Sequence, residues 1–240
     1  MQNKSLISLC ILAIASLITY SCGDSTSPGQ EESSSSQLSS STTLSSGEAP
    51  SSSSGISSGT SSIAMSSSIG FSRGEPLAIG GYSYPTVNIG SQTWMAENMK
   101  VVPASDSSWC YNDATSNCDT YGRLYRYETA MTLCPAGWHL PDTTEWQTLV
   151  AAVGSTKKLK TSTLWTSIGK GTDDYSFSAV PGGYSYNGSS EYMGEEAYFW
   201  TSTESDEYNA WFVKIGGFTS TLFSMSFGKD FAYSVRCVHD

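Results

Sequence analysis

The chain has 240 residues, of which 22 are acidic and 12 basic, giving a formal net charge of −10 at pH 7 with histidine neutral. This balance argues against nucleic acid as a partner, because phosphates require a basic surface and the sequence contains no lysine or arginine cluster. The length and a hydrophobic content of 38 % permit one ordinary domain with a real core.

Residues 1–21 are typical of a bacterial signal peptide. Lys4 is the only charged residue among them, and residues 6–18 form an apolar run with a few serines. At about 13 residues, this run is shorter than the roughly 20 that a membrane-spanning helix needs, so it fits the apolar region of a signal peptide.

The signal region ends in a sequence that resembles the bacterial lipoprotein box, Ser21-Cys22-Gly23. In that box the cysteine is lipidated and becomes the first residue of the mature protein. We therefore expect Cys22 to carry palmitate and to anchor the protein in the cell envelope, at the outer-membrane surface. Tyr20 is bulkier than the usual residue there, and the alternative is an ordinary secretory signal with an incidental cysteine.

Residues 22–74 are rich in serine, and no aromatic residue occurs between Cys22 and Phe71. Such a segment cannot bury enough apolar surface to offset its ordering entropy, so we expect a disordered linker. The linker would hold the following domain, residues 75–240, away from a membrane. All seven tryptophans lie in that domain.

The first half of the domain contains the helix signals. Asp142 and Glu145 form a capping box before apolar residues at helical spacing, and Gly154 ends the pattern, which predicts a helix from Asp142 to Val153. Before it, residue patterns predict three shorter elements: a hairpin over 86–95, a strand over 122–127 and a helix over 127–133.

Strand patterns dominate the second half of the domain, at residues 197–202, 210–215 and 233–238. With one or two helices early and strands late, the fold class is α+β. Trp138, Trp146, Trp200 and Trp211 occur in periodic blocks and are expected in the core.

Four cysteines lie in the domain: Cys110, Cys118, Cys134 and Cys237. An even number in an exported domain indicates two disulfides, for which three pairings exist. Closing the small loop between Cys110 and Cys118 costs little entropy, which favours that pair and leaves Cys134 with Cys237.

Six sequence blocks in the domain resemble the Fibrobacter succinogenes major paralogous domain family, whose members are typically exported or lipid-anchored: Trp94–Asn98, Tyr121–Tyr125, Cys134–Trp146, Asp173–Tyr184, Trp200–Glu204 and Ser234–Val238. More distantly, the cysteine layout is similar to the C-type-lectin-like fold, which the formylglycine-generating enzymes share. This resemblance implies a twisted antiparallel sheet with one or two helices, long loops and disulfide bonds.

We expect no catalytic residues. Formylglycine-generating enzymes use a close cysteine pair late in the chain, where this sequence has only Cys237, and the only histidines are His139 and His239. Histidine or thiolate metal sites are therefore not expected, nor is any cofactor. Calcium remains an option through carboxylates such as Asp173-Asp174 and Glu204–Glu207, although solvated acidic surfaces explain them as well.

Recognition residues are expected between Pro181 and Gly194, in a segment of Gly, Ser, Tyr and Asn. We expect this segment to be a long loop whose tyrosines stack on sugar rings; the alternative is a half-buried strand edge. The predicted ligand-binding residues are Tyr184, Tyr186, Glu191 and Tyr192.

These observations favour a surface-displayed, lipid-anchored, non-catalytic binding module. Its expected partners are a glycan, such as plant-cell-wall polysaccharide, or a surface protein. The alternatives are a structural lipoprotein of the cell envelope with no small ligand and, third, an oxidase of the formylglycine-generating type.

Overall fold

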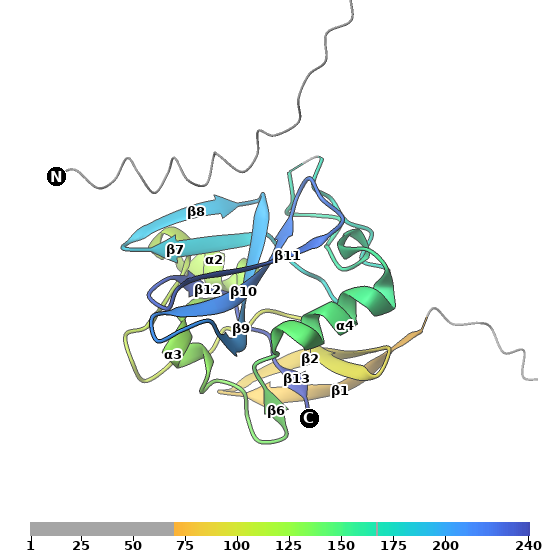
Figure 1. The fold of residues 1–240 in the computed structure, drawn as a ribbon, viewed down its shortest axis with the longest axis horizontal. Coiled ribbons are helices and arrows are strands. Elements are labelled where there is room, and N and C mark those ends of the chain that lie inside the picture. Colours follow the sequence, from red (N-terminus) through yellow and green to blue (C-terminus); the bar gives the residue numbers. More distant parts are fainter. Residues whose placement is uncertain (1–69, 167) are drawn as a thin grey trace, which may run out of the picture. The chain divides into compact units, whose positions relative to one another are not determined.

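The computed structural model describes residues 70–166 and 168–240 (Figure 1). The predicted signal peptide, Cys22 and most of the predicted linker lie outside the described residues. Strand β1 (Phe71–Ile79) begins within the expected linker, 22–74, so regular structure starts a few residues before residue 75. Within the described residues, no helix combines the length and apolar character needed to cross a membrane.

The first sheet contains five strands in the order β1-β2-β3-β13-β6. The predicted hairpin is confirmed as β2 (Tyr82–Ile89) and β3 (Gln92–Met95). Two short strands from later in the chain complete this sheet, β6 (Trp138–His139) and β13 (Val238–His239). All its strand pairs are antiparallel.

The second sheet follows the order β11-β10-β9-β7-β12-β5-β4, with β8 paired to β7. Strands β9 and β10 confirm the strands predicted at 197–202 and 210–215. The bounds in this sheet are β4 (Ser108–Trp109), β5 (Leu124–Arg126), β7 (Gly182–Tyr186), β8 (Ser189–Met193), β9 (Glu196–Glu204), β10 (Asn209–Gly216), β11 (Leu222–Gly228) and β12 (Ala232–Tyr233).

The continuous strand predicted over 233–238 is wrong, because the chain there passes from one sheet to the other. β12 ends at Tyr233 in the second sheet and β13 starts at Val238 in the first. Between them, the carbonyl oxygens of Val235 and Cys237 accept hydrogen bonds from Met99 and Met95. All four intervening residues are buried, including the polar Ser234 and Arg236, so the alternation of residue types along this segment does not distinguish a crossing segment from a single strand.

Helix α4 (Thr143–Val153) confirms the strongest helix prediction. Asp142 caps it, Glu145 completes the capping box, and Gly154 ends it in the left-handed conformation. The other helices are short and include α2, which the sequence analysis did not predict: 3₁₀ helix η1 (Tyr111–Asp113), α2 (Thr115–Tyr121), α3 (Tyr127–Ala130) and 3₁₀ helix η2 (Thr156–Lys158). Helix α3 is shorter than the predicted 127–133, and β5 is shorter than the predicted 122–127.

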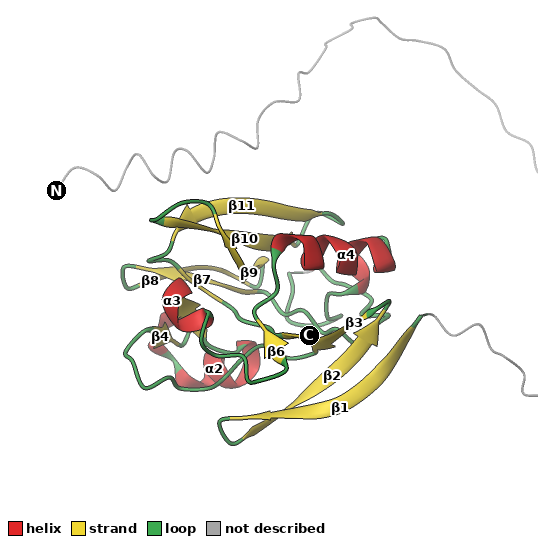
Figure 2. Cartoon of the chain, turned by 60° about the horizontal axis from the view of Figure 1, so that its bottom comes forward, coloured by secondary structure: helices red, strands yellow, loops and turns green. Residues whose placement is uncertain are grey.

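Helix α4 lies between the first sheet and strands β9–β11 (Figures 1 and 2). Its Trp146 is fully buried and packs on Trp94 and Phe199, with ring centroids 4.8 and 5.1 Å away. A second cluster, rich in tyrosine, surrounds Trp200 and Tyr233. Trp146 and Trp200 are thus core residues as expected, whereas Trp138 and Trp211 are only half-buried.

Both expected disulfides are present, Cys110–Cys118 and Cys134–Cys237. The first closes a local loop around η1 and α2, while the second joins residues separated by 103 positions. The second bond ties the chain just after α3 to the segment between β12 and β13. The domain is therefore α+β, mostly sheet, with two disulfide bonds.

Candidate functional site

The predicted tyrosines lie in the β7–β8 hairpin instead of a long loop. Tyr186 pairs with Ser189, so only Asn187 and Gly188 connect the two strands. These turn residues have φ angles of 48° and 75°, as the tight two-residue turn favoured by Asn-Gly requires. Tyr and Ser alternate with period two in this segment, which is the pattern of a strand. The segment therefore forms a hairpin and not an open loop, although glycines lie at both of its ends.

Tyr184 is a core residue of this hairpin, with 8 % of its surface exposed. Its hydroxyl donates a hydrogen bond of 3.0 Å to Glu191. Burial raises the pKa of Tyr184, so the hydroxyl remains a donor across the physiological range. The ring is enclosed by four other rings and offers no face to a ligand: Tyr192, Tyr198, Phe231 and Tyr233, at centroid distances of 5.8, 5.2, 5.6 and 6.2 Å.

The remaining predicted residues separate into two places. Tyr186 is half-buried and stacks on Phe231, with ring centroids 4.1 Å apart and an angle of 11° between the planes. Tyr186 also lines a small surface pocket. Tyr192 packs near Tyr184, at 5.8 Å, and Glu191 is exposed; neither of them lines that pocket.

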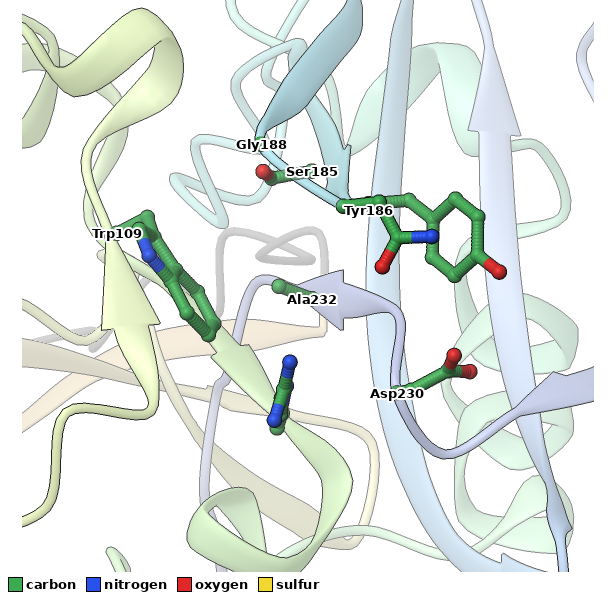
Figure 3. A pocket seen from close by; sticks show the side chains of 8 residues that line it. Trp109, Ser185, Tyr186, Gly188, Asp230 and Ala232 are labelled. Atoms are coloured by element: carbon green, nitrogen blue, oxygen red, sulfur yellow. The ribbon is translucent and has the colours of Figure 1, made fainter. Parts of the chain in front are cut away.

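We call this depression the hairpin pocket (Figure 3). It has a volume of about 60 Å³. Strands β4, β5, β12 and β7 are neighbours in the second sheet, so the sheet order brings together residues that are far apart in sequence. The pocket is lined by Trp109, Arg126, Ser185, Tyr186, Asn187, Gly188, Asp230 and Ala232.

The charged and polar groups of the hairpin pocket are available to a ligand. Arg126 lies over the Trp109 ring, with 5.3 Å between the guanidinium carbon and the ring centroid. Among the described residues, the side chains of Arg126, Asn187 and Asp230 form no hydrogen bond or ion pair with protein groups. The pocket therefore combines an indole, a guanidinium, an amide and a carboxylate, which suit polar ligands with an apolar face.

Three of the acidic residues considered for calcium, Asp173, Glu204 and Asp206, are engaged by other protein groups. The Asp173 carboxylate accepts hydrogen bonds from the backbone and the hydroxyl of Ser178, at 2.7 and 2.8 Å. Glu204 pairs with Lys229 at 2.9 Å. Across residues 70–166 and 168–240, no group of three or more His, Cys, Asp or Glu side chains is arranged to hold a metal ion.

Asp206 similarly organises the turn between β9 and β10. It accepts hydrogen bonds from the side chain of Asn209 and from the backbone of Tyr208. These hydrogen bonds, led by that of the Asn209 side chain, lower the pKa of Asp206. Two of the three acidic residues in the Glu204–Glu207 segment, Glu204 and Asp206, are therefore paired with other protein groups.

His139 acts as a structural link between two parts of the chain. Its Nε2 lies 2.8 Å from Glu145 of helix α4, and its Nδ1 lies 2.6 Å from Asp240. Partial burial opposes the charged form, but the hydrogen bonds to Asp240 and Glu145 outweigh it and raise the pKa of His139. Both ring nitrogens therefore face carboxylates, one on helix α4 and one at Asp240.

A second hollow, of about 400 Å³, lies between the β1–β2 hairpin and the turn at 173–178. Asp173, Ser176 and Ser178 line it, and all three have positive φ angles. Arg236 stabilises this turn by donating a hydrogen bond of 2.7 Å to the carbonyl oxygen of Ser178. No aromatic side chain lines this hollow, so it lacks the stacking surface of the hairpin pocket.

Of the four residues predicted from the sequence, only Tyr186 lines the hairpin pocket, and the prediction did not include Trp109, Arg126, Asn187 or Asp230. The Asn-Gly pair was a usable signal for the turn. Nothing local connects Trp109 with Asp230, because their proximity depends on the order of strands in the second sheet.

Fold and site together define an α+β domain with two disulfides and a shallow pocket of aromatic and polar side chains. Residues 87–239 match the family described as the Fibrobacter succinogenes major domain. The match covers more than half of the chain, and the protein belongs to this family. A search of curated proteins and a search of solved structures each found no match.

Proposed function

We propose that the protein is a non-catalytic binding module that recognises a polysaccharide through the hairpin pocket. The supporting observation is the set of groups that line the pocket: Arg126 over the Trp109 ring, and Asn187 and Asp230, whose side chains form no hydrogen bond or ion pair with other described residues. Sugar rings present an apolar face that stacks on indole, while their hydroxyls pair with amide, carboxylate and guanidinium groups.

The size of the pocket favours a polymer over a small buried ligand. Its volume of about 60 Å³ is far below the roughly 300–1,000 Å³ of pockets that enclose small molecules. It can receive part of one sugar unit while the rest of the chain crosses the surface. Plant-cell-wall polysaccharide is the candidate class with which we begin.

Two further elements complete the proposal. The protein is a cell-envelope lipoprotein held at the outer-membrane surface by lipid on Cys22. Its fold is a divergent member of the C-type-lectin-like group, an idea supported by the Cys134–Cys237 bond to the segment that leads into β13. The proposal makes no use of calcium or of a cofactor.

The binding test compares Trp109→Ala with a matched control, Phe218→Ala, in the full chain. Phe218 is 68 % exposed and does not line the pocket. On a panel of immobilised plant polysaccharides, Trp109→Ala should weaken retention by roughly 1 kcal/mol or more, about fivefold in affinity. Phe218→Ala should bind like the parent, and thermal melting checks that both variants are folded at the temperature of the assay, because Trp109 also packs against a small apolar cluster.

Two results would contradict the proposal. One is equal retention of the parent and Trp109→Ala on every polysaccharide that binds. The other is no retention at all, with co-purification of an envelope protein, which would favour a structural lipoprotein. Four blocked cysteines in a thiol titration of the native domain would independently exclude an oxidase that depends on free thiols.

The anchor is tested separately by Cys22→Ser in cells. The variant should appear in the soluble fraction, because each methylene of the lipid contributes about 0.8 kcal/mol to membrane partitioning. Cys10→Ser is the control, since it makes the same substitution in the signal region and leaves both Lys4 and Cys22 in place. If Cys22→Ser stays with membranes as the parent does, lipidation at Cys22 is wrong.

A further inference from the structure

Strand β11 is an open edge of the second sheet. It pairs with β10 on one side and ends the order of strands on the other (Figure 2). Its register with β10 runs without interruption from Leu222 to Gly228. Such an edge presents unpaired backbone N–H and C=O groups in a regular row, which another strand can join.

Within the described residues, the other long edge strands carry features that discourage pairing with a further strand, and β11 does not. Edge strand β1 contains Arg73, Glu75 and Pro76, and its pairing with β2 is irregular near these residues. Edge strand β8 carries Glu191. By contrast, β11 has no charged residue and no proline, which are the usual devices against strand addition.

The sequence of β11 is self-complementary. Residues 223–227 read Phe-Ser-Met-Ser-Phe, the same in both directions. If two β11 strands pair antiparallel around a two-fold axis at Met225, each Phe223 faces a Phe227 and each Ser224 faces a Ser226. We infer that β11 binds β11 of a second copy of this chain, forming one sheet across a two-fold axis.

Two features of this contact favour dimerisation: its aromatic side chains would pair across the contact, and no like charges would meet. Phe223 is 41 % exposed, and Phe227 is only partly buried. Each Phe223 would cover Phe227 of the second copy, and aromatic cross-strand pairs stabilise antiparallel sheets. Just beyond the strand, Lys229 would face Thr221, so the symmetric contact brings no like charges together although the chain carries a net charge of −10.

Two charge variants of the full chain separate this contact from any general effect on folding. Both carry Cys22→Ser, which removes the expected lipid. Ser224→Lys with Ser226→Lys places lysine opposite lysine twice, and should weaken the dimer by about tenfold or more. Ser224→Lys with Ser226→Glu adds the same number of charges to the same strand but places lysine opposite glutamate, and should remain dimeric.

Sedimentation equilibrium over a range of protein concentrations measures the mass of each variant and so its oligomeric state. The Cys22→Ser chain and the Lys/Glu variant should reach the mass of a dimer, and the Lys/Lys variant should remain a monomer. A Glu/Glu variant at the same positions should also be monomeric, and mixing it with the Lys/Lys variant should restore a dimer. Thermal melting checks that all the variants are folded.

Three outcomes would overturn the inference. The first is a Cys22→Ser chain that stays monomeric at every concentration. The second is a Lys/Lys variant that dimerises as well as the Lys/Glu variant. The third is growth beyond a dimer with the same mass distribution in all variants, because pairing of one edge around a two-fold axis closes at two copies.

Discussion

Arg236 is a fully buried cation whose partners are neutral oxygen atoms. Its Nε donates to the Asn98 side chain at 2.7 Å, and its Nη2 donates to the carbonyl of Ser178 at 2.7 Å. Nη1 donates to the carbonyls of Phe177 and Met95, and the guanidinium lies 4.4 Å from the Phe177 ring centroid. Burial lowers the pKa of Arg236, so these bonds are what offset the cost of burying the charge.

We predict that Arg236→Lys destabilises the domain by about 3 kcal/mol or more. Lysine keeps the charge but lacks the planar fork, so buried carbonyls lose their donors, and hydrogen bonds to charged groups are worth about 1.5–3 kcal/mol each. Arg126→Lys is the control, because Arg126 is exposed and surface changes usually stay within about 0.5 kcal/mol. Urea unfolding measures both; equal midpoints would show that the fork is dispensable.

Among the helices and strands, those that depend on local sequence patterns were predicted correctly. The Asp142–Glu145 capping box and the apolar spacing behind it gave helix α4 with its correct end at Gly154. Alternation and a short turn gave the β2–β3 hairpin. In both cases the residues that carry the signal lie within or next to the element itself. The prediction therefore did not depend on contacts with distant parts of the chain.

Elements that depend on distant partners could not be predicted in this way. Helix α2 has a polar sequence without apolar periodicity, and the Cys110–Cys118 bond ties the middle of the helix to the residue before η1. The buried segment from Tyr233 to Val238 passes from the second sheet to the first. Its sequence pattern resembles that of one continuous strand, because the pattern does not show where the chain changes sheet. For the site, the same limit applies: Tyr186 was identifiable from its neighbours, whereas Trp109 and Asp230 meet only through the strand order of the second sheet.

At the scale of the whole molecule, the two disulfides should differ in their contribution to stability. Replacing Cys134 and Cys237 together by Ala should lower the free energy of unfolding by about 2–5 kcal/mol, because a loop of 103 residues is released in the unfolded chain. Replacing Cys110 and Cys118, which lie 8 residues apart, should cost less by about 2 kcal/mol in the chain-entropy model.

Denaturant unfolding of the two double variants, under the same conditions as the parent, measures this difference. A larger loss from the Cys110/Cys118 variant would contradict the entropic argument. It would show that the local bond stabilises η1 and α2 mainly through the folded state, where Arg123 lies 3.6 Å from both of its sulfur atoms.

The position of β13 inside the first sheet has a consequence for how the protein is made. Val238 pairs with Trp94 of β3 on one side and with His139 of β6 on the other. While the ribosome produces the intervening chain, β3 has no partner on that side, so the sheet can be completed only after Val238 has been synthesised and released. The edges of β3 and β6 that pair with β13 therefore stay unpaired until then, and these pairings are the last of the first sheet to form.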